Sequence, residues 1–134
     1  MSEVITDKLT GRATAGDVTI TDGSVTMKLQ DGVIKSWCLW EQDSTQAVTD
    51  SLNVSSIADN GTGYTTQTFT NNFNNANICP TYNGVHDAGT YVAWGVTAHD
   101  TPPTTSTIRA EYLNNAGATT DVEFAASHIV GDLA

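Results

Sequence analysis

The sequence predicts an all-β protein with an extended N-terminal arm, a β-hairpin and a C-terminal antiparallel β-sandwich of jelly-roll-like form. About seven or eight short segments alternate apolar and polar residues at spacings of roughly 8–12 residues, with turn-forming residues between them. No segment shows convincing helical periodicity. Most of the polarity comes from Thr, Asn, Ser and Gly, which suits the exposed faces of antiparallel strands.

Length and charge divide the chain into two expected parts. With 134 residues, 39% of them hydrophobic, the chain can form one compact domain and little more. We expect an arm over residues 1–35, with four basic and five acidic side chains, and a body over residues 36–134, with one basic and ten acidic. Nucleic acids and anionic membranes are bound by clustered Lys and Arg, so we expect neither as a partner.

The compartment is also predicted from the sequence. No apolar run approaches the ~20 residues needed to cross a bilayer, and residues 1–8 lack the basic start and apolar core of a signal peptide. We therefore expect no membrane insertion, and folding in a cytosol. In a reducing compartment Cys38 and Cys79 are more often free thiols than a disulfide, although the bridged alternative stays open.

The first 35 residues lack the means to fold alone. Residues 1–16 carry too few large apolar side chains, so they must lean on another surface or be disordered. Residues 17–21 and 24–29 alternate around Asp22-Gly23, which is typical of a two-residue hairpin turn. A lone hairpin with one apolar face is marginally stable, and its exposed apolar row would favour aggregation.

Assembly of three copies would remove that problem, because their apolar rows could be buried along a shared threefold axis as an intertwined homotrimer. The alternative is that residues 17–34 pack on the body as edge strands. The arm residues that we expect to make contacts between copies or with an anchoring partner are Val4, Ile5, Leu9, Val18, Ile20, Val25, Met27 and Leu29.

The body begins with an aromatic strand, Trp37-Cys38-Leu39-Trp40, which should place at least one indole in a core or a subunit interface. A hairpin is then expected over residues 51–70. Its two flanks alternate around Asp59-Asn60-Gly61-Thr62-Gly63, where Asn-Gly supplies the positive φ angles of a tight turn and Gly63 allows a bulge or a longer loop.

These segments resemble a known family. The runs Lys35-Ser36-Trp37, Asn53-Val54-Ser55-Ser56-Ile57, Asp59-Asn60-Gly61-Thr62-Gly63 and Phe69-Thr70 are similar to the C-terminal domain of small bacteriophage tail-fibre-like proteins. The resemblance covers residues 35 to about 77, roughly a third of the chain, and departs from the family between Trp40 and Thr49, where a Gly/Thr-rich turn is usual. It implies a homotrimeric fibre whose N-terminal arm attaches to the virion, and it marks no active site.

The remaining segments continue the β pattern. We expect a short strand over residues 78–82 with Pro80 at a sheet edge, and a central strand over residues 90–98 that is covered on both faces. Pro102 and Pro103 should interrupt the sheet. Two further strands are expected over residues 107–113 and 120–126, with a turn at 114–117 between them and a tail from residue 127.

Catalysis and metal binding are not predicted. His86-Asp87 and His99-Asp100 are adjacent pairs in expected loops, but no nucleophile is nominated as their partner, so we expect no enzyme activity. The histidines and cysteines lack ligand spacing, and Asp59-Asn60-Gly61 matches only the middle of a calcium loop. We expect no cofactor, although a calcium site among converging acids stays open.

Recognition of a partner is the remaining chemistry. Stacking on aromatic rings together with Asn and Asp hydrogen bonds is the usual physics of sugar binding, but most of the aromatic residues lie in expected strands, where core packing is favoured. The residues that we expect to contact a receptor are Tyr82, His86, Asp87, His99 and Asp100, on the basis of their loop location.

Together these features favour a bacteriophage virion protein, a homotrimeric tail fibre or spike that folds in the host cytoplasm and binds a glycan or protein on the host surface. Its other partners would be virion proteins of the tail or capsid. Two alternatives stay open, namely a capsid-decorating head fibre with no receptor role and an isolated carbohydrate-binding module.

Overall fold

The computed structural model describes residues 18–22, 24–28, 33–85 and 94–133. The chain divides into two compact units, residues 1–33 and 34–134, close to the expected boundary at residue 35. Several expected contact residues lie outside the described residues, namely Val4, Ile5, Leu9, Leu29, His86 and Asp87, as do the side chains of Ile20, Val25 and Met27.

The described part of the first unit is the predicted β-hairpin. Strand β1 (Thr19–Asp22) pairs antiparallel with β2 (Val25–Lys28), so the hairpin is confirmed. The expected turn position is wrong by one residue. Asp22 pairs with Val25 and is therefore the last residue of β1, not the first residue of the turn.

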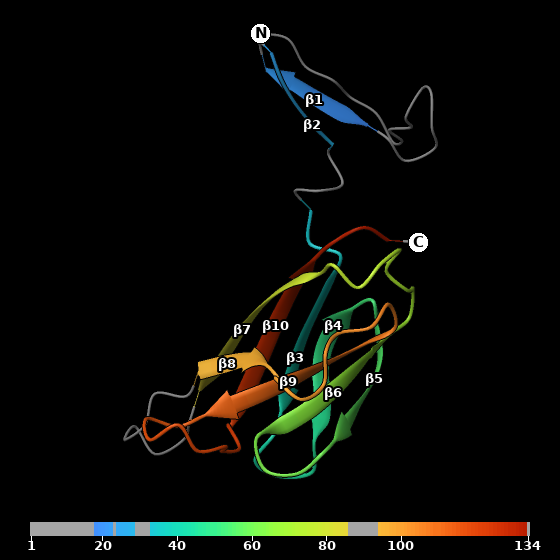
Figure 1. The fold of residues 1–134 in the computed structure, drawn as a ribbon. Helices are drawn as coiled ribbons and strands as arrows, with labels where there is room; N and C mark the ends of the chain where they lie inside the picture. Colours follow the sequence, from blue (N-terminus) through green and yellow to red (C-terminus); the bar gives the residue numbers. More distant parts are fainter. Residues whose placement is uncertain (1–17, 23, 29–32, 86–93, 134) are drawn as a thin grey trace, which may run out of the picture. The chain divides into compact units, whose positions relative to one another are not determined.

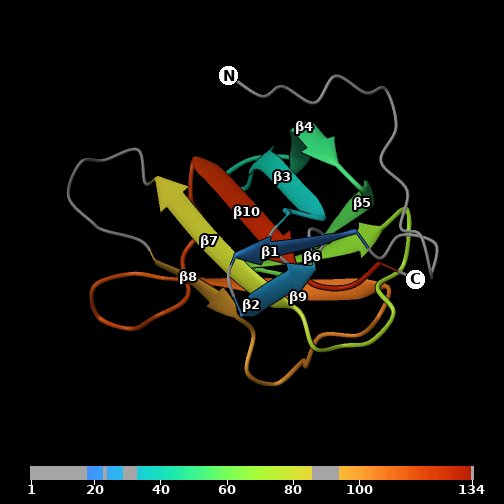
Figure 2. The same cartoon turned by 90° about the horizontal axis from the view of Figure 1, so that it is seen from above.

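The second unit is a sandwich of two antiparallel four-stranded sheets, and the described residues contain no helix (Figures 1 and 2). The strand orders are β4-β3-β10-β7 in one sheet and β5-β6-β9-β8 in the other. The predicted all-β sandwich is therefore confirmed. The strands are β3 (Ser36–Glu41), β4 (Ala47–Leu52), β5 (Val54–Asp59), β6 (Tyr64–Phe69), β7 (Cys79–Val85), β8 (Trp94–Thr97), β9 (Thr107–Leu113) and β10 (Phe124–Val130).

The expected central hairpin is present as β5 and β6, with positive φ at Gly61 (105°) and Gly63 (80°). Its first flank, however, is not one strand. Asn53 adopts a left-handed φ of 59°, which Asn tolerates better than most residues, and the chain passes there from β4 in one sheet to β5 in the other. The Asn53 side chain donates to the Asn71 carbonyl (3.1 Å) and accepts from the Asn71 N–H (2.7 Å).

Strand β9 has the predicted bounds, but the last strand does not. It runs from Phe124 to Val130 rather than over residues 120–126. The preceding residues are held by other bonds, because the Gly63 N–H donates to the Asp121 carboxylate (2.7 Å) and the Val122 N–H donates to Gln42 Oε1 (3.2 Å). The backbone just before them is bonded to β9, because Thr119 bridges Leu113 and the Thr120 N–H donates to the Tyr112 carbonyl (3.0 Å).

Strand β8 is an edge strand, so the expectation of a central strand covered twice is wrong. Trp94 and Val96 are 48% and 38% exposed. Gly95 lies so close to the interior that a Cβ there would contact the Cβ of Tyr82 and lie 2.9 Å from the Tyr112 ring. This close approach brings β8 against β7, the edge strand of the other sheet, which carries Pro80 as predicted.

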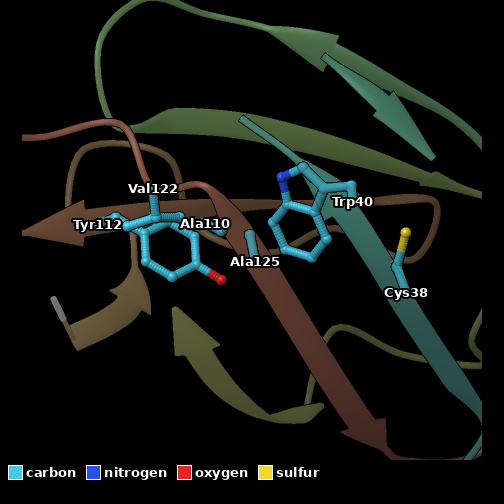
Figure 3. Packing of buried hydrophobic residues seen from close by; sticks show 6 residues of the cluster. All are labelled: Cys38, Trp40, Ala110, Tyr112, Val122 and Ala125. Atoms are coloured by element: carbon cyan, nitrogen blue, oxygen red, sulfur yellow. The ribbon is translucent and has the colours of Figure 1, made fainter. Parts of the chain in front are cut away.

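The core lies between the two sheets. Figure 3 shows Trp40 from β3 and Tyr112 from β9 with Ala125 between them. The two rings meet edge to face, with centroids 6.1 Å apart. A second cluster joins Phe69, Phe73, Ile108 and Ile129. The expectation of a buried indole is confirmed by Trp40.

Both cysteines are free thiols, as expected. Cys38 is buried in the core, and burial raises the pKa of its thiol to about 12. Cys79 is exposed on β7. None of the described residues forms a helix that could cross a membrane.

Candidate functional site

The outer face of the sheet β5-β6-β9-β8 carries the densest group of polar and aromatic side chains. Along β6, Thr65 and Gln67 are buried, so the alternating residues Tyr64 and Thr66 face outward. The register then places Glu111 between Tyr64 and Val96, Arg109 beside Thr66, and Trp94 beside Leu113. We call this surface the Glu111 face, defined by Tyr64, Thr66, Trp94, Val96, Arg109 and Glu111.

Glu111 is the least exposed residue of this face, at 7%, although it lies on the outside of the sheet. Both carboxylate oxygens have neighbours. The Tyr64 hydroxyl donates to Oε1 (3.0 Å), and His99 Nδ1, on an exposed side chain, lies 3.7 Å from Oε2. The hydrogen bond to Glu111 raises the pKa of Tyr64, because ionisation would place a phenolate beside a carboxylate.

Arg109 supplies the donors of the same face. Its Nε donates to Thr66 Oγ1 (3.2 Å), and the Thr66 hydroxyl in turn donates to Asn60 Oδ1. The other guanidinium N–H groups have no partner among the described residues. Arg109 is also the only Lys or Arg in residues 36–134, so it is the one fixed cation of the body. Donors that point outward and lack a partner can bind the oxygen atoms of a ligand.

Trp94 and Val96 add an apolar strip next to these polar groups. They lie two residues apart on β8 and share the outward side with Glu111 and Leu113. Core packing of Trp94 was expected from its apolar surroundings in the sequence, and that expectation is wrong. Trp94 lies beside Leu113, four residues along β9 from Arg109, so the indole can stack on one part of an extended ligand while Arg109 holds another.

The sequence-predicted receptor residues fall in different places. Tyr82 points into the sandwich, packs against both core clusters, and has its hydroxyl buried. Burial raises the pKa of Tyr82 to about 12. His99 and Asp100 are exposed in the segment after β8, and His99 borders the Glu111 face.

Sequence reasoning missed Tyr64, Arg109 and Glu111. The sequence contains only part of the information needed to find them. The alternation of residues 107–113 indicates that Arg109 and Glu111 share a side of one strand. It does not indicate that the side is outward, nor that Tyr64, 47 positions away, supplies the hydroxyl for Glu111.

The outer face of the other sheet has a different character. The register aligns Leu52, Trp37 and His128 across β4, β3 and β10, and aligns Glu41, Phe124 and Val85 across β3, β10 and β7. We call this surface the Phe124 face, defined by Trp37, Leu39, Leu52, Val85 and Phe124. Val85, Leu52 and Phe124 are 59%, 48% and 46% exposed, so the face carries three large exposed apolar side chains.

A third polar group lies inside the sandwich. Thr65 Oγ1 accepts from Trp40 Nε1 (3.3 Å) and Gln42 Nε2 (3.0 Å), and donates to Gln46 Oε1 (2.9 Å). These bonds satisfy buried polar atoms and hold the loop after β3, so they serve the fold. Among the residues that the structure describes, no group of three or more His, Cys, Asp or Glu could hold a metal ion.

No protein-family model, curated protein or solved structure matches this chain. What the protein does therefore has to be inferred from the hairpin unit and from the two outer faces of the body.

Proposed function

We propose that this protein is a subunit of a homotrimeric bacteriophage tail fibre or spike. Its N-terminal arm attaches to other virion proteins, and its sandwich body binds the host surface. The observation that carries the proposal is the Phe124 face, where Val85, Leu52 and Phe124 are exposed large apolar side chains that a partner could cover. The resemblance of residues 35–77 to phage tail-fibre-like proteins supports the same assignment.

A second copy of the chain is the cover that fits the charges best. The body carries ten acidic side chains and one Arg, so two copies repel each other over most of their surface. Register places only Glu41 and Asp50 among the acids on the Phe124 face. Copies can therefore approach each other there with little electrostatic cost and a large apolar gain.

The size of the face indicates that the hairpin unit takes part as well. Four strands of about six residues, about 4.8 Å apart and rising about 3.3 Å per residue, cover roughly 400 Å². A stable interface buries about 800 Å² on each partner. We propose that the remaining area comes from the apolar residues of the first unit.

Trimerisation also explains how a weak site on the body becomes effective. Three rigidly spaced copies bind a repetitive surface with far longer residence than one copy, without any new contact. A host cell surface is repetitive, and a fibre held on the virion presents its three bodies together.

Light scattering of the full chain after size exclusion tests the proposal. We expect a trimer at micromolar concentration, and expect Phe124→Ser to shift it toward monomer. The matched control is Val96→Ser, an exposed apolar residue on the other sheet, which should leave the trimer intact. A monomeric wild-type chain would overturn the trimer, and equal behaviour of the two variants would remove the Phe124 face from the interface.

A further inference from the structure

We infer that the Glu111 face binds an uncharged oligosaccharide, with one sugar ring stacked on Trp94 and the hydroxyl groups of another sugar held by Arg109. The inference rests on the proposed function, because it names the chemistry that the body recognises on the host. Three features support it, namely the exposed indole of Trp94, the acidic net charge of the body, and the Glu111 carboxylate, whose two oxygens already have neighbours.

The exposed indole supplies the apolar part of the site. Trp94 lies on an edge strand with Val96 beside it, and both side chains are exposed. Folding alone would favour burying an indole, yet the Cβ of Tyr82 and the ring of Tyr112 fill the space beneath Gly95. A pyranose ring has one apolar C–H face of a size that an indole covers, while its hydroxyl groups point to the sides.

The charge balance excludes acidic ligands. The body has nine more acidic than basic side chains, which repel a polyanion at long range. A single guanidinium cannot offset that field, and the Nε of Arg109 is already bonded to Thr66. Its remaining N–H groups can still donate to neutral hydroxyl oxygens, and these bonds need no net charge on the ligand.

The occupied carboxylate argues against a basic ligand. Glu111 is the acid at the centre of the face, but one oxygen accepts from Tyr64 and the other lies beside His99. Only 7% of the residue is exposed, so an incoming Lys or Arg would have to displace these neighbours. Glu111 is therefore a positioning residue that holds Tyr64 and His99 at the rim of the Trp94 surface.

Binding to an oligosaccharide array by the full-length trimer tests the inference. The array contains neutral oligomers of hexoses, deoxyhexoses and N-acetylhexosamines, acidic oligomers that contain uronic acids, and an oligolysine peptide as the basic probe. We expect binding to neutral members only, with an affinity that changes little with salt, because screening acts on charged ligands.

The variants Trp94→Ala and Leu133→Ala complete the experiment. Loss of ring stacking should weaken binding on the order of tenfold in Trp94→Ala. Leu133→Ala removes an equally exposed apolar side chain that belongs to neither face, and should bind as the wild type does. Circular dichroism of both variants verifies that the fold is retained.

Other results would overturn the inference. These are binding to no neutral member, preference for the acidic oligomers or for oligolysine, and equal affinity of Trp94→Ala and the wild type. Light scattering reports separately on the trimer. If Trp94→Ala is a trimer and binds host cells as well as the wild type does, the proposed function stands and the glycan site is wrong. If the protein is a monomer that binds neutral glycans, the glycan site stands and the trimeric fibre is wrong.

Discussion

The two outer faces of the body differ although the sheets beneath them are built alike. Both sheets have four antiparallel strands, and both send alternate side chains outward. On the Glu111 face the outward groups satisfy one another, as Tyr64 does for Glu111 and Thr66 for Arg109. On the Phe124 face three of them, Leu52, Val85 and Phe124, are large apolar side chains that are about half exposed. The two faces therefore offer different chemistry, since the Glu111 face carries bonded polar groups and the Phe124 face carries large exposed apolar side chains.

The largest expected change in the free energy of unfolding comes from a substitution in the core between the two sheets. Trp40 is fully buried, meets Tyr112 edge to face and donates to Thr65. Trp40→Ala should lower the free energy of unfolding by about 3–5 kcal/mol, from lost apolar burial and the cavity left behind. Urea unfolding followed by circular dichroism measures this.

The outward residues serve as controls for that prediction. Phe124→Ser and Trp94→Ala, measured on the monomeric fraction, should each change the unfolding free energy by no more than about 0.5 kcal/mol. If either costs as much as Trp40→Ala, its face is part of the core and the contrast between core and outer faces fails.

An intermediate effect is expected at Asn53, the residue that joins the two sheets. Its left-handed φ costs an ordinary residue about 1–2 kcal/mol, which Gly avoids. Both Asn53→Ala and Asn53→Gly lose the two bonds to Asn71, so their difference isolates the backbone. We expect Asn53→Ala to be less stable than Asn53→Gly by about 1 kcal/mol in urea unfolding. Equal stabilities would show that the corner does not impose this conformation.

The smallest effect is local to the Glu111 face and is spectroscopic. The pKa of Tyr64 is raised by Glu111, so its neutral form is favoured, and its ionisation is delayed to higher pH than that of a free phenol. Glu111→Gln removes the negative charge, and the pKa of Tyr64 should fall back toward 10.

Absorbance near 295 nm follows this titration, and Tyr64→Phe identifies which transition belongs to Tyr64. Tyr82 ionises later, because burial raises its pKa to about 12. A titration that is identical in the wild type and in Glu111→Gln would mean that the hydrogen bond between Tyr64 and Glu111 does not form in solution.

Local sequence chemistry was enough to predict part of this fold. The alternation of residues 107–113 and the Asn-Gly turn before Tyr64 led to β9 and to the β5–β6 hairpin. These elements depend on neighbours along the chain, which the sequence displays directly.

The elements that were mispredicted depend on distant partners. The strand around Trp94 is an edge strand because β9 pairs with β6 on one side and with β8 on the other, and no further strand among the described residues pairs with β8. The start of β10 is decided by bonds from Gly63 and Gln42. Which way a single side chain points depends on distant partners as well. Alternation cannot say which side of a strand is inside, so Tyr82 was placed outside and Trp94 inside.

The edge strands of the two sheets lie next to one another, which affects how easily another strand could extend a sheet. Edge strands β7 and β8 lie against each other on one side, and β4 and β5 are joined through Asn53 on the other (Figure 2). Their unpaired backbone groups are thereby less open to a foreign strand that would extend either sheet. Either sheet of the body is therefore protected against edge-to-edge extension, through which exposed strands aggregate.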